Sequence, residues 1–113
     1  STAIGRALVA ASPRETAAEL IARAPLTPFT DATNLDREAI ASDISETAKR
    51  GYAYVNGEFE AGIAGLAIPI GPGLAEPAAI GVSGDAKRFE DPEKLQIIVE
   101  TLRECSKVVA GLL

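Results

Sequence analysis

The stretch IAGLAIPI at residues 63–70, followed by AAIGVSG at residues 78–84, predicts two neighbouring β-strands. Gly71-Pro72-Gly73 lies between them and is typical of a turn, so we expect an antiparallel hairpin. Because side chains alternate between the two faces of a strand, each face of this hairpin has its own composition. One face is predicted to carry large apolar side chains and the other to carry small ones.

The large face is expected to be packed core beneath the last helix, and it consists of Leu66, Ile68, Ile80 and Val82. The small face consists of Gly65, Ala67, Ala79, Gly81 and Ser83. Small side chains on an inner face indicate that another group approaches closely, because protein interiors are close-packed. That group is either a packed helix or a bound ligand, and the packed helix is the commoner case because pockets are few per protein.

Three helices are expected ahead of the hairpin. Apolar residues at helical spacing predict the first helix over residues 2–11, in which Gly5 indicates close approach to another helix or a ligand. Ser12 is expected to cap a second helix that stops before Pro25. The third helix is expected to be capped by Thr33 or Asn34.

The remaining predicted elements are a short strand and a last helix, and they give the chain the element order of an α+β fold. Gly51 is expected just past the third helix, residues 52–55 predict a short strand, and Asp91 begins a long last helix. Cys105 lies on the apolar stripe of that helix and is expected in the core. Helices segregated against an antiparallel sheet make an α+β fold. Three short strands are few for an independent sheet, so we expect further strands before Ser1.

The length, composition and net charge of the chain favour one soluble domain that does not itself contact nucleic acid. The 113 residues suit a single domain, and no apolar stretch is long enough to cross a membrane. The 16 acidic against 11 basic residues give a net charge of −5, which disfavours binding to DNA or to an anionic membrane. The single cysteine fits a reducing cytoplasm.

Catalytic, metal and cofactor sites are not expected. Histidine is absent, which excludes a His-based triad within the chain and disfavours a zinc site. Glu58 and Glu60 could form a carboxylate pair for acid–base work, but no nucleophile, base or metal set accompanies them. We expect them to be solvated loop charges, with Phe59 dipping into the core.

Five motifs resemble, in order and spacing, the effector domain of bacterial transcription regulators of the isocitrate-lyase-regulator (IclR) type. Residues 2–8 resemble "ATAxGRALLA", residues 51–53 "GYA", residues 58–62 "EExEPG", residues 67–70 "AAPV" and residues 78–84 "AALSVSGP". The resemblance implies a GAF-like (profilin-like) antiparallel sheet with helices packed on it, which binds a small organic effector, often an aromatic or organic acid.

The resemblance also implies what lies outside the chain. Residues 1–113 are expected to be an effector-binding domain truncated at its N-terminus, without the winged helix-turn-helix domain through which the family binds promoter DNA. The family's proteins form homodimers or homotetramers, and the effector shifts their DNA-binding state. The alternative is a GAF-like interaction or oligomerisation module that binds no ligand.

Pocket positions follow from the resemblance as well. They lie at the start of the first helix, on the strand after "GYA" and on both hairpin strands, and they are Ala3, Ile4, Val55, Ile63, Gly65, Gly81 and Ser83. Gly65, Gly81 and Ser83 also lie on the small face that the alternation predicts. The family often carries Arg-Cys at positions 64–65, an acidic residue at Val55 and a serine at Gly81. We therefore expect a roomier, less polar pocket with Ser83 as its main hydroxyl.

Overall fold

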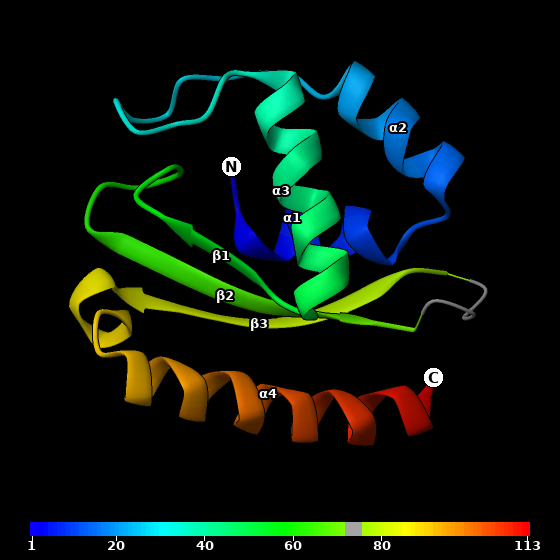
Figure 1. Cartoon of the computed structure of the whole chain (residues 1–113), viewed down its shortest axis with the longest axis vertical. Coiled ribbons are helices and arrows are strands. Elements are labelled where there is room, and N and C mark those ends of the chain that lie inside the picture. Colours follow the sequence, from blue (N-terminus) through cyan, green and yellow to red (C-terminus); the bar gives the residue numbers. More distant parts are fainter. Residues whose placement is uncertain (72–75) are drawn as a thin grey trace.

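The molecule has three layers, with the sheet in the middle (Figure 1). The computed structural model describes residues 1–71 and 76–113. Helices α1, α2 and α3 lie on one side of the sheet and α4 lies on the other. The predicted α+β fold is confirmed, because helices cover both faces of an antiparallel sheet.

The first three helices are α1 (Ala3–Ala11), α2 (Arg14–Arg23) and α3 (Arg37–Arg50). The expected cap at Ser12 is wrong, because its hydroxyl donates to the Leu8 carbonyl at the end of α1 and α2 begins without a side-chain cap. The expected caps at Thr33 and Asn34 are also wrong. The Asp36 carboxylate caps α3 by accepting from the amides of residues 38 and 39.

Gly51 ends α3 in the left-handed region at φ 86°, as expected for a residue just past a helix. Strands β1 (Ala53–Asn56), β2 (Ile63–Ile70) and β3 (Ala78–Asp85) then form one antiparallel sheet in the order β1-β2-β3. The predicted turn at residues 71–73 falls largely on residues 72–75, which lie outside the described residues.

The predicted division of the hairpin into a large face and a small face agrees with the register of the two strands. Leu66 pairs with Val82 and Ile68 pairs with Ile80, while Gly65 pairs with Ser83 and Ala67 pairs with Gly81. Large side chains therefore share one face and small side chains share the other.

The large face packs beneath α4 (Pro92–Leu112), which Asp91 caps after a short 3-10 helix η1 (Ala86–Phe89). This core contains Leu66, Ile68, Phe89, Val99 and Leu102, with Ile80 packed against it. The prediction that Val82 belongs to this core is wrong, because Val82 is 43% exposed. β3 is the edge strand of the described sheet, so Val82 has a strand neighbour on one side only.

Cys105 is exposed, so its expected place in the core is wrong. Steps of three residues fall roughly 60° short of a full helical turn. Cys105 is two such steps beyond the buried Val99 and has rotated away from the sheet. Leu112, predicted on the same stripe, is also exposed.

Candidate functional site

Helix α1 covers one part of the small face of the hairpin. Ala3 and Ala7 pack against Ala53, Val55 and Ala67, with Ala79 beside this cluster. Ala7 and Ala67 are fully buried. In this part the small side chains serve helix packing, because alanine and glycine let a helix approach the sheet closely.

The other part of the small face borders a hollow of about 370 Å³, which we call the sheet hollow. It contains all seven residues that the sequence resemblance implied: Ala3, Ile4, Val55, Ile63, Gly65, Gly81 and Ser83. They come from the start of α1 and from all three strands, so the tertiary structure brings them together from distant parts of the chain. The other lining residues are Ser1, Thr2, Phe59, Glu60, Ala64, Leu66 and Val82.

The two glycines of the sheet hollow differ in how much room surrounds them. A Cβ built on Gly65 would lie 3.4 Å from the Ala3 Cβ, which is an ordinary contact. A Cβ built on Gly81 would lie 2.9 Å from the Leu66 carbonyl oxygen and 3.0 Å from the Ala67 Cβ. Gly81 is therefore required by the sheet itself, whereas a Cβ at position 65 would make only ordinary contacts with its neighbours.

The polar end of the sheet hollow is the amino end of α1. Thr2 caps this helix by accepting from the Gly5 amide at 3.1 Å, and no acidic residue lies in the first turn. The first amides of a helix have no partner within the helix and carry partial positive charge, so they favour an anionic group. Burial, followed by the charge of Arg6, lowers the pKa of the neighbouring Ser1 amino group.

Glycine at position 5 is explained by a local contact that the sequence did not reveal. A Cβ on Gly5 would lie 2.9 Å from the Thr2 Oγ1, which is the oxygen that caps α1. The expected close approach is therefore made by the capping hydroxyl, and not by another helix.

A buried ion-pair cluster fixes the loop between β1 and β2 at the edge of this hollow. Arg6 is only 7% exposed, and its Nη1 donates to Asp43 at 3.0 Å while its Nη2 donates to Glu58 at 2.8 Å. The same Glu58 oxygen accepts from the Asn34 amide at 2.8 Å. The expectation that Glu58 is a solvated loop charge is wrong, because its pairing with Arg6 stabilises the loop.

Phe59 was missed by the sequence analysis as a lining residue. The expectation that it dips into the core is wrong, because Phe59 is 54% exposed and packs against Phe29 with ring centroids 4.8 Å apart and planes inclined by 51°. The loop that carries it is tied down by the hydroxyls of Thr30 and Thr33, which donate to the carbonyls of Gly57 and Glu58. No local signal could have revealed this, because alternation places a phenylalanine between two glutamates on the face opposite the charges, which is equally consistent with burial.

The described residues contain no group of three or more His, Cys, Asp or Glu side chains placed to hold a metal ion. Within the same residues, no helix combines the length with the apolar character that crossing a bilayer requires. The sheet hollow offers a ligand the amino end of α1, the hydroxyl-bearing residues Ser1, Thr2 and Ser83, and apolar contacts.

Comparison with known proteins places this architecture in a class. Residues 1–110 match the family described as "Bacterial transcriptional regulator IclR C-terminal". The match covers nearly the whole chain, so the class of protein is the C-terminal domain of a bacterial transcriptional regulator. The chain belongs to the IclR family.

Three relatives illustrate the similarity. The transcriptional repressor IclR of Escherichia coli (strain K12) is 29% identical over 112 residues, which are 96% of this chain and 41% of the repressor. The crystal structure of the Thermotoga maritima IclR has a TM-score of 0.90 and 29% identity, and the match covers 99% of this chain and 45% of that one. The chain thus spans less than half the length of these two relatives.

The third relative is less similar in sequence, at 24% identity, so it is evidence of a shared fold only. It is the inducer-binding domain of the PobR transcription factor from Acinetobacter, a double mutant in complex with 3-hydroxybenzoic acid. It has a TM-score of 0.82 and 24% identity, and the match covers 99% of this chain and 65% of that one.

Proposed function

We propose that residues 1–113 form the effector-binding part of an IclR-type transcription regulator, and that the sheet hollow receives the effector. The observation that carries this proposal is the convergence of seven residues from α1 and three strands on one hollow of about 370 Å³. Pockets for small organic molecules have volumes of roughly 300–1,000 Å³.

The chemistry of the lining favours an organic acid with an apolar body. The amides at the start of α1 and the Ser83 hydroxyl are suited to hold its polar end. Ile4, Val55 and Ile63 are suited to contact its apolar body. Glu60 lines the same hollow, and its negative charge favours an acid whose carboxylate lies at α1, away from the loop.

The exposed ring of Phe59 favours an aromatic body, because stacked rings attract one another beyond simple burial. The PobR domain shares this fold and was crystallised in complex with 3-hydroxybenzoic acid. We therefore place aromatic and other small organic acids first among the candidates.

In the whole regulator, we propose that a winged helix-turn-helix domain outside residues 1–113 binds promoter DNA in the cytoplasm, and that the present chain lacks the N-terminal part of its own domain. The net charge of −5 supports this division, because phosphate contacts need a basic face. Effector binding would change the DNA affinity of a homodimer or homotetramer by favouring one arrangement of the subunits. The role is binding and not catalysis, since Glu58 is held in ion pairs.

A ligand screen on a matched pair of variants tests the sheet hollow. Gly65→Val adds a side chain on the hollow side, whereas Gly84→Val is the control because a Cβ there meets nothing within 4 Å. An acid present at 100 times its Kd should stabilise the wild type by about 2.7 kcal/mol, seen as a rise in Tm. The rise should persist in Gly84→Val and disappear in Gly65→Val.

The same screen distinguishes the proposed effector-binding function from the alternative function. A panel of organic acids that leaves Tm unchanged in the wild type would favour an interaction or oligomerisation module without a ligand. A rise in Tm that survives in Gly65→Val would instead place the ligand elsewhere in the molecule. Gly81 is unsuitable for this test, because any side chain there collides with the Leu66 carbonyl.

A further inference from the structure

The loop between β1 and β2, residues 57–62, forms part of the wall of the sheet hollow. Phe59 and Glu60 line the hollow from this loop, whereas Ala3 and Ile4 line it from the start of α1. The shape of the hollow at this end therefore depends on how the loop is placed relative to α1.

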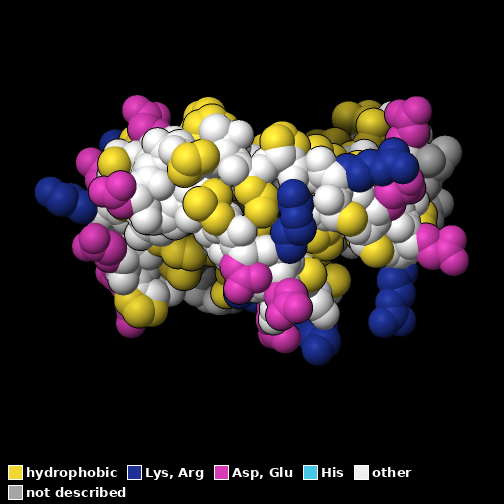
Figure 2. Space-filling model, turned by 90° about the horizontal axis from the view of Figure 1, so that it is seen from above, with side chains coloured by type: hydrophobic (Ala, Val, Ile, Leu, Met, Phe, Trp, Pro, Cys, Tyr) yellow, Lys and Arg dark blue, Asp and Glu magenta, His cyan; other side chains and the backbone are white. Residues whose placement is uncertain are grey.

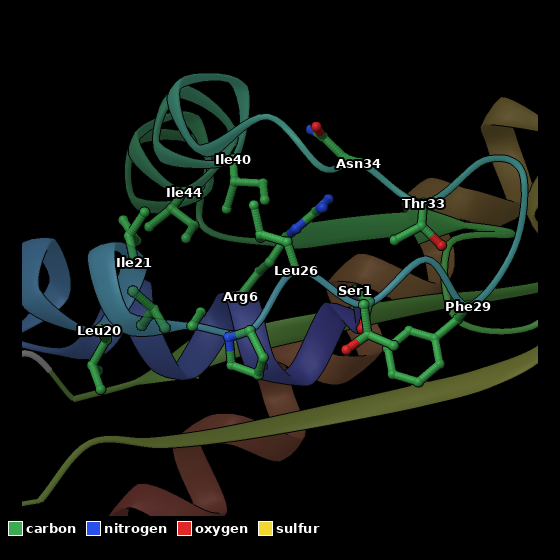
Figure 3. Close-up of a pocket in the computed structure, with 15 residues that line it drawn as sticks. Ser1, Arg6, Leu20, Ile21, Leu26, Phe29, Thr33, Asn34, Ile40 and Ile44 are labelled. Atoms are coloured by element: carbon green, nitrogen blue, oxygen red, sulfur yellow. The ribbon is translucent and has the colours of Figure 1, made fainter.

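Glu58 joins this loop to α1. Its Oε1 accepts from the Arg6 Nη2 and from the Asn34 amide, both at 2.8 Å. Figure 3 shows Arg6 extending from α1 towards the segment that carries Asn34. The side chains of Arg6 and Glu58 are only 7% and 13% exposed, so solvent and salt screen their attraction little. Because Arg6 follows Ile4 by two positions, the ion pair connects the loop to the same turn of helix that lines the hollow.

Phe29 supports the ring of Phe59 from outside the hollow. The two rings pack with centroids 4.8 Å apart, and Phe29 is not among the residues that line the sheet hollow. Phe29 lies on the segment between α2 and α3, from which the hydroxyls of Thr30 and Thr33 donate to backbone carbonyls of the β1–β2 loop. The segment thus holds both the backbone of the loop and its aromatic ring.

The exposure of Phe59 would mean little without these contacts. Figure 2 views the molecule from the side of α2 and α3 and shows hydrophobic side chains reaching the surface between charged ones. Single exposed apolar side chains are ordinary on a protein surface. Phe59 differs because it lines a hollow, is 54% exposed, and belongs to a loop that an ion pair, two hydroxyls and a second ring hold in place.

A fixed aromatic ring at the wall of a site distinguishes ligands by the kind of ring they carry. Two aromatic rings attract each other beyond the area they bury, whereas a saturated ring gains only from burial. One such pair corresponds to a preference of about three- to tenfold in affinity. A mobile ring would lose part of this gain, because ordering the ring and its loop on binding costs entropy.

We propose that Phe59 is the specificity-determining residue of the sheet hollow, and that it selects acids with a planar aromatic ring over acids with a saturated ring of the same size. Glu58 is the positioning residue, which holds Phe59 in place through its ion pair with Arg6. This inference rests on the function proposed for the sheet hollow, since it presupposes that an organic acid binds there.

Two acids that differ only in the saturation of the ring test the proposal on the wild-type chain. Benzoate and cyclohexanecarboxylate each carry one carboxylate on a six-membered ring. Titrations followed by nuclear magnetic resonance give the dissociation constant of each acid, and the ratio of the two constants measures the preference. We expect benzoate to bind about three- to tenfold more tightly in the wild type.

Two variants of Phe59 test whether this ring provides the preference. Phe59→Leu keeps an apolar side chain without the aromatic ring, so both acids should still bind and the ratio should fall to about one. Phe59→Tyr keeps the ring and should retain the preference. Because Phe59 is half exposed, both variants should fold.

A matched pair of variants tests the positioning role of Glu58. Glu58→Ala and Asp43→Ala each remove one of the two carboxylates paired with Arg6, but only Glu58 lies on the loop. Glu58→Ala should lower the preference for benzoate to less than about twofold, whereas Asp43→Ala should retain it. A general loss of stability would not change the ratio of two affinities within one folded variant. If the alanine variants do not fold, Glu58→Gln and Asp43→Asn give the same comparison.

The outcomes separate this inference from the proposed function. Equal affinity of the two acids in the wild type, or a preference that persists in Phe59→Leu, would overturn the role of Phe59 and leave the sheet hollow as the effector site. Binding of other organic acids but of neither ring acid would do the same. Equal losses of preference in Glu58→Ala and Asp43→Ala would overturn the positioning role of Glu58. If no acid of the screening panel binds, the proposed function fails, and this inference fails with it.

Discussion

Glu58 and Glu60 are separated by one residue in the chain but have different surroundings. Glu58 is largely buried and accepts from Arg6 and from the Asn34 amide, whereas Glu60 is exposed at the edge of the sheet hollow. A buried carboxylate that is paired holds its neighbours in place, whereas an exposed carboxylate contributes little to the stability of the fold. Glu58 therefore positions the loop that carries Phe59.

Replacing these glutamates separately should show this difference. Glu58→Gln keeps the shape but leaves Arg6 with one carboxylate instead of two, and we expect a loss of about 2 kcal/mol in the free energy of unfolding. Glu60→Gln should change it by less than about 0.5 kcal/mol. Urea unfolding of the two variants measures both values, and equal losses would contradict the role given to Glu58.

At the scale of elements, α4 buries only part of the apolar stripe that its sequence displays. Val99 and Leu102 face the sheet, whereas Cys105, Val108 and Leu112 are exposed. A stripe of apolar residues at every third position winds around a straight helix, so its two ends cannot both face the sheet.

The exposure of Cys105 can be measured directly. We expect the folded chain to react with a disulfide reagent such as Ellman's reagent at a rate within about tenfold of the unfolded chain, because an accessible thiol needs no opening of the structure. A thiol in the core would react only through rare unfolding, and would be slower by roughly a thousandfold or more. Protection of that size would contradict the placement of Cys105.

At the scale of the molecule, helices cover both faces of the sheet (Figure 1). The start of α1 and the three strands together line the sheet hollow. The sheet hollow brings together the amino end of α1, the hydroxyl-bearing residues Ser1, Thr2 and Ser83, and the glycines of β2 and β3. The acidic balance of the chain makes neither face suited to phosphate groups.

The chain by itself should therefore not bind promoter DNA. We expect no retardation of a promoter fragment by residues 1–113 at about 0.1 M salt, because counterion release requires clustered basic residues. The full-length regulator should retard the same fragment in an effector-dependent way. Salt-sensitive binding of DNA by the isolated chain would contradict the proposal that a separate domain makes the DNA contacts.

Much of the fold could be predicted because it is encoded locally. The alternation in residues 63–70 and 78–84 determined which side chains share each face of the hairpin. Asp91 and Gly51 marked helix ends through their own backbone and side-chain chemistry. The caps at residues 12, 33 and 34 were predicted wrongly, because several residues near each helix start could cap it and only the packed chain selects one.

Within the candidate site, the sequence determined which residues have small or apolar side chains, and the family resemblance indicated which of them lie near the pocket. Only the tertiary structure decided that α1 fills half of the small face and leaves the other half open, since this depends on where the helix ends over the sheet. It also decided that Arg6 meets Asp43 and Glu58, and that Phe59 stays outside the core. These are contacts between residues far apart in the chain, and local patterns carry no information about which distant partner a side chain meets.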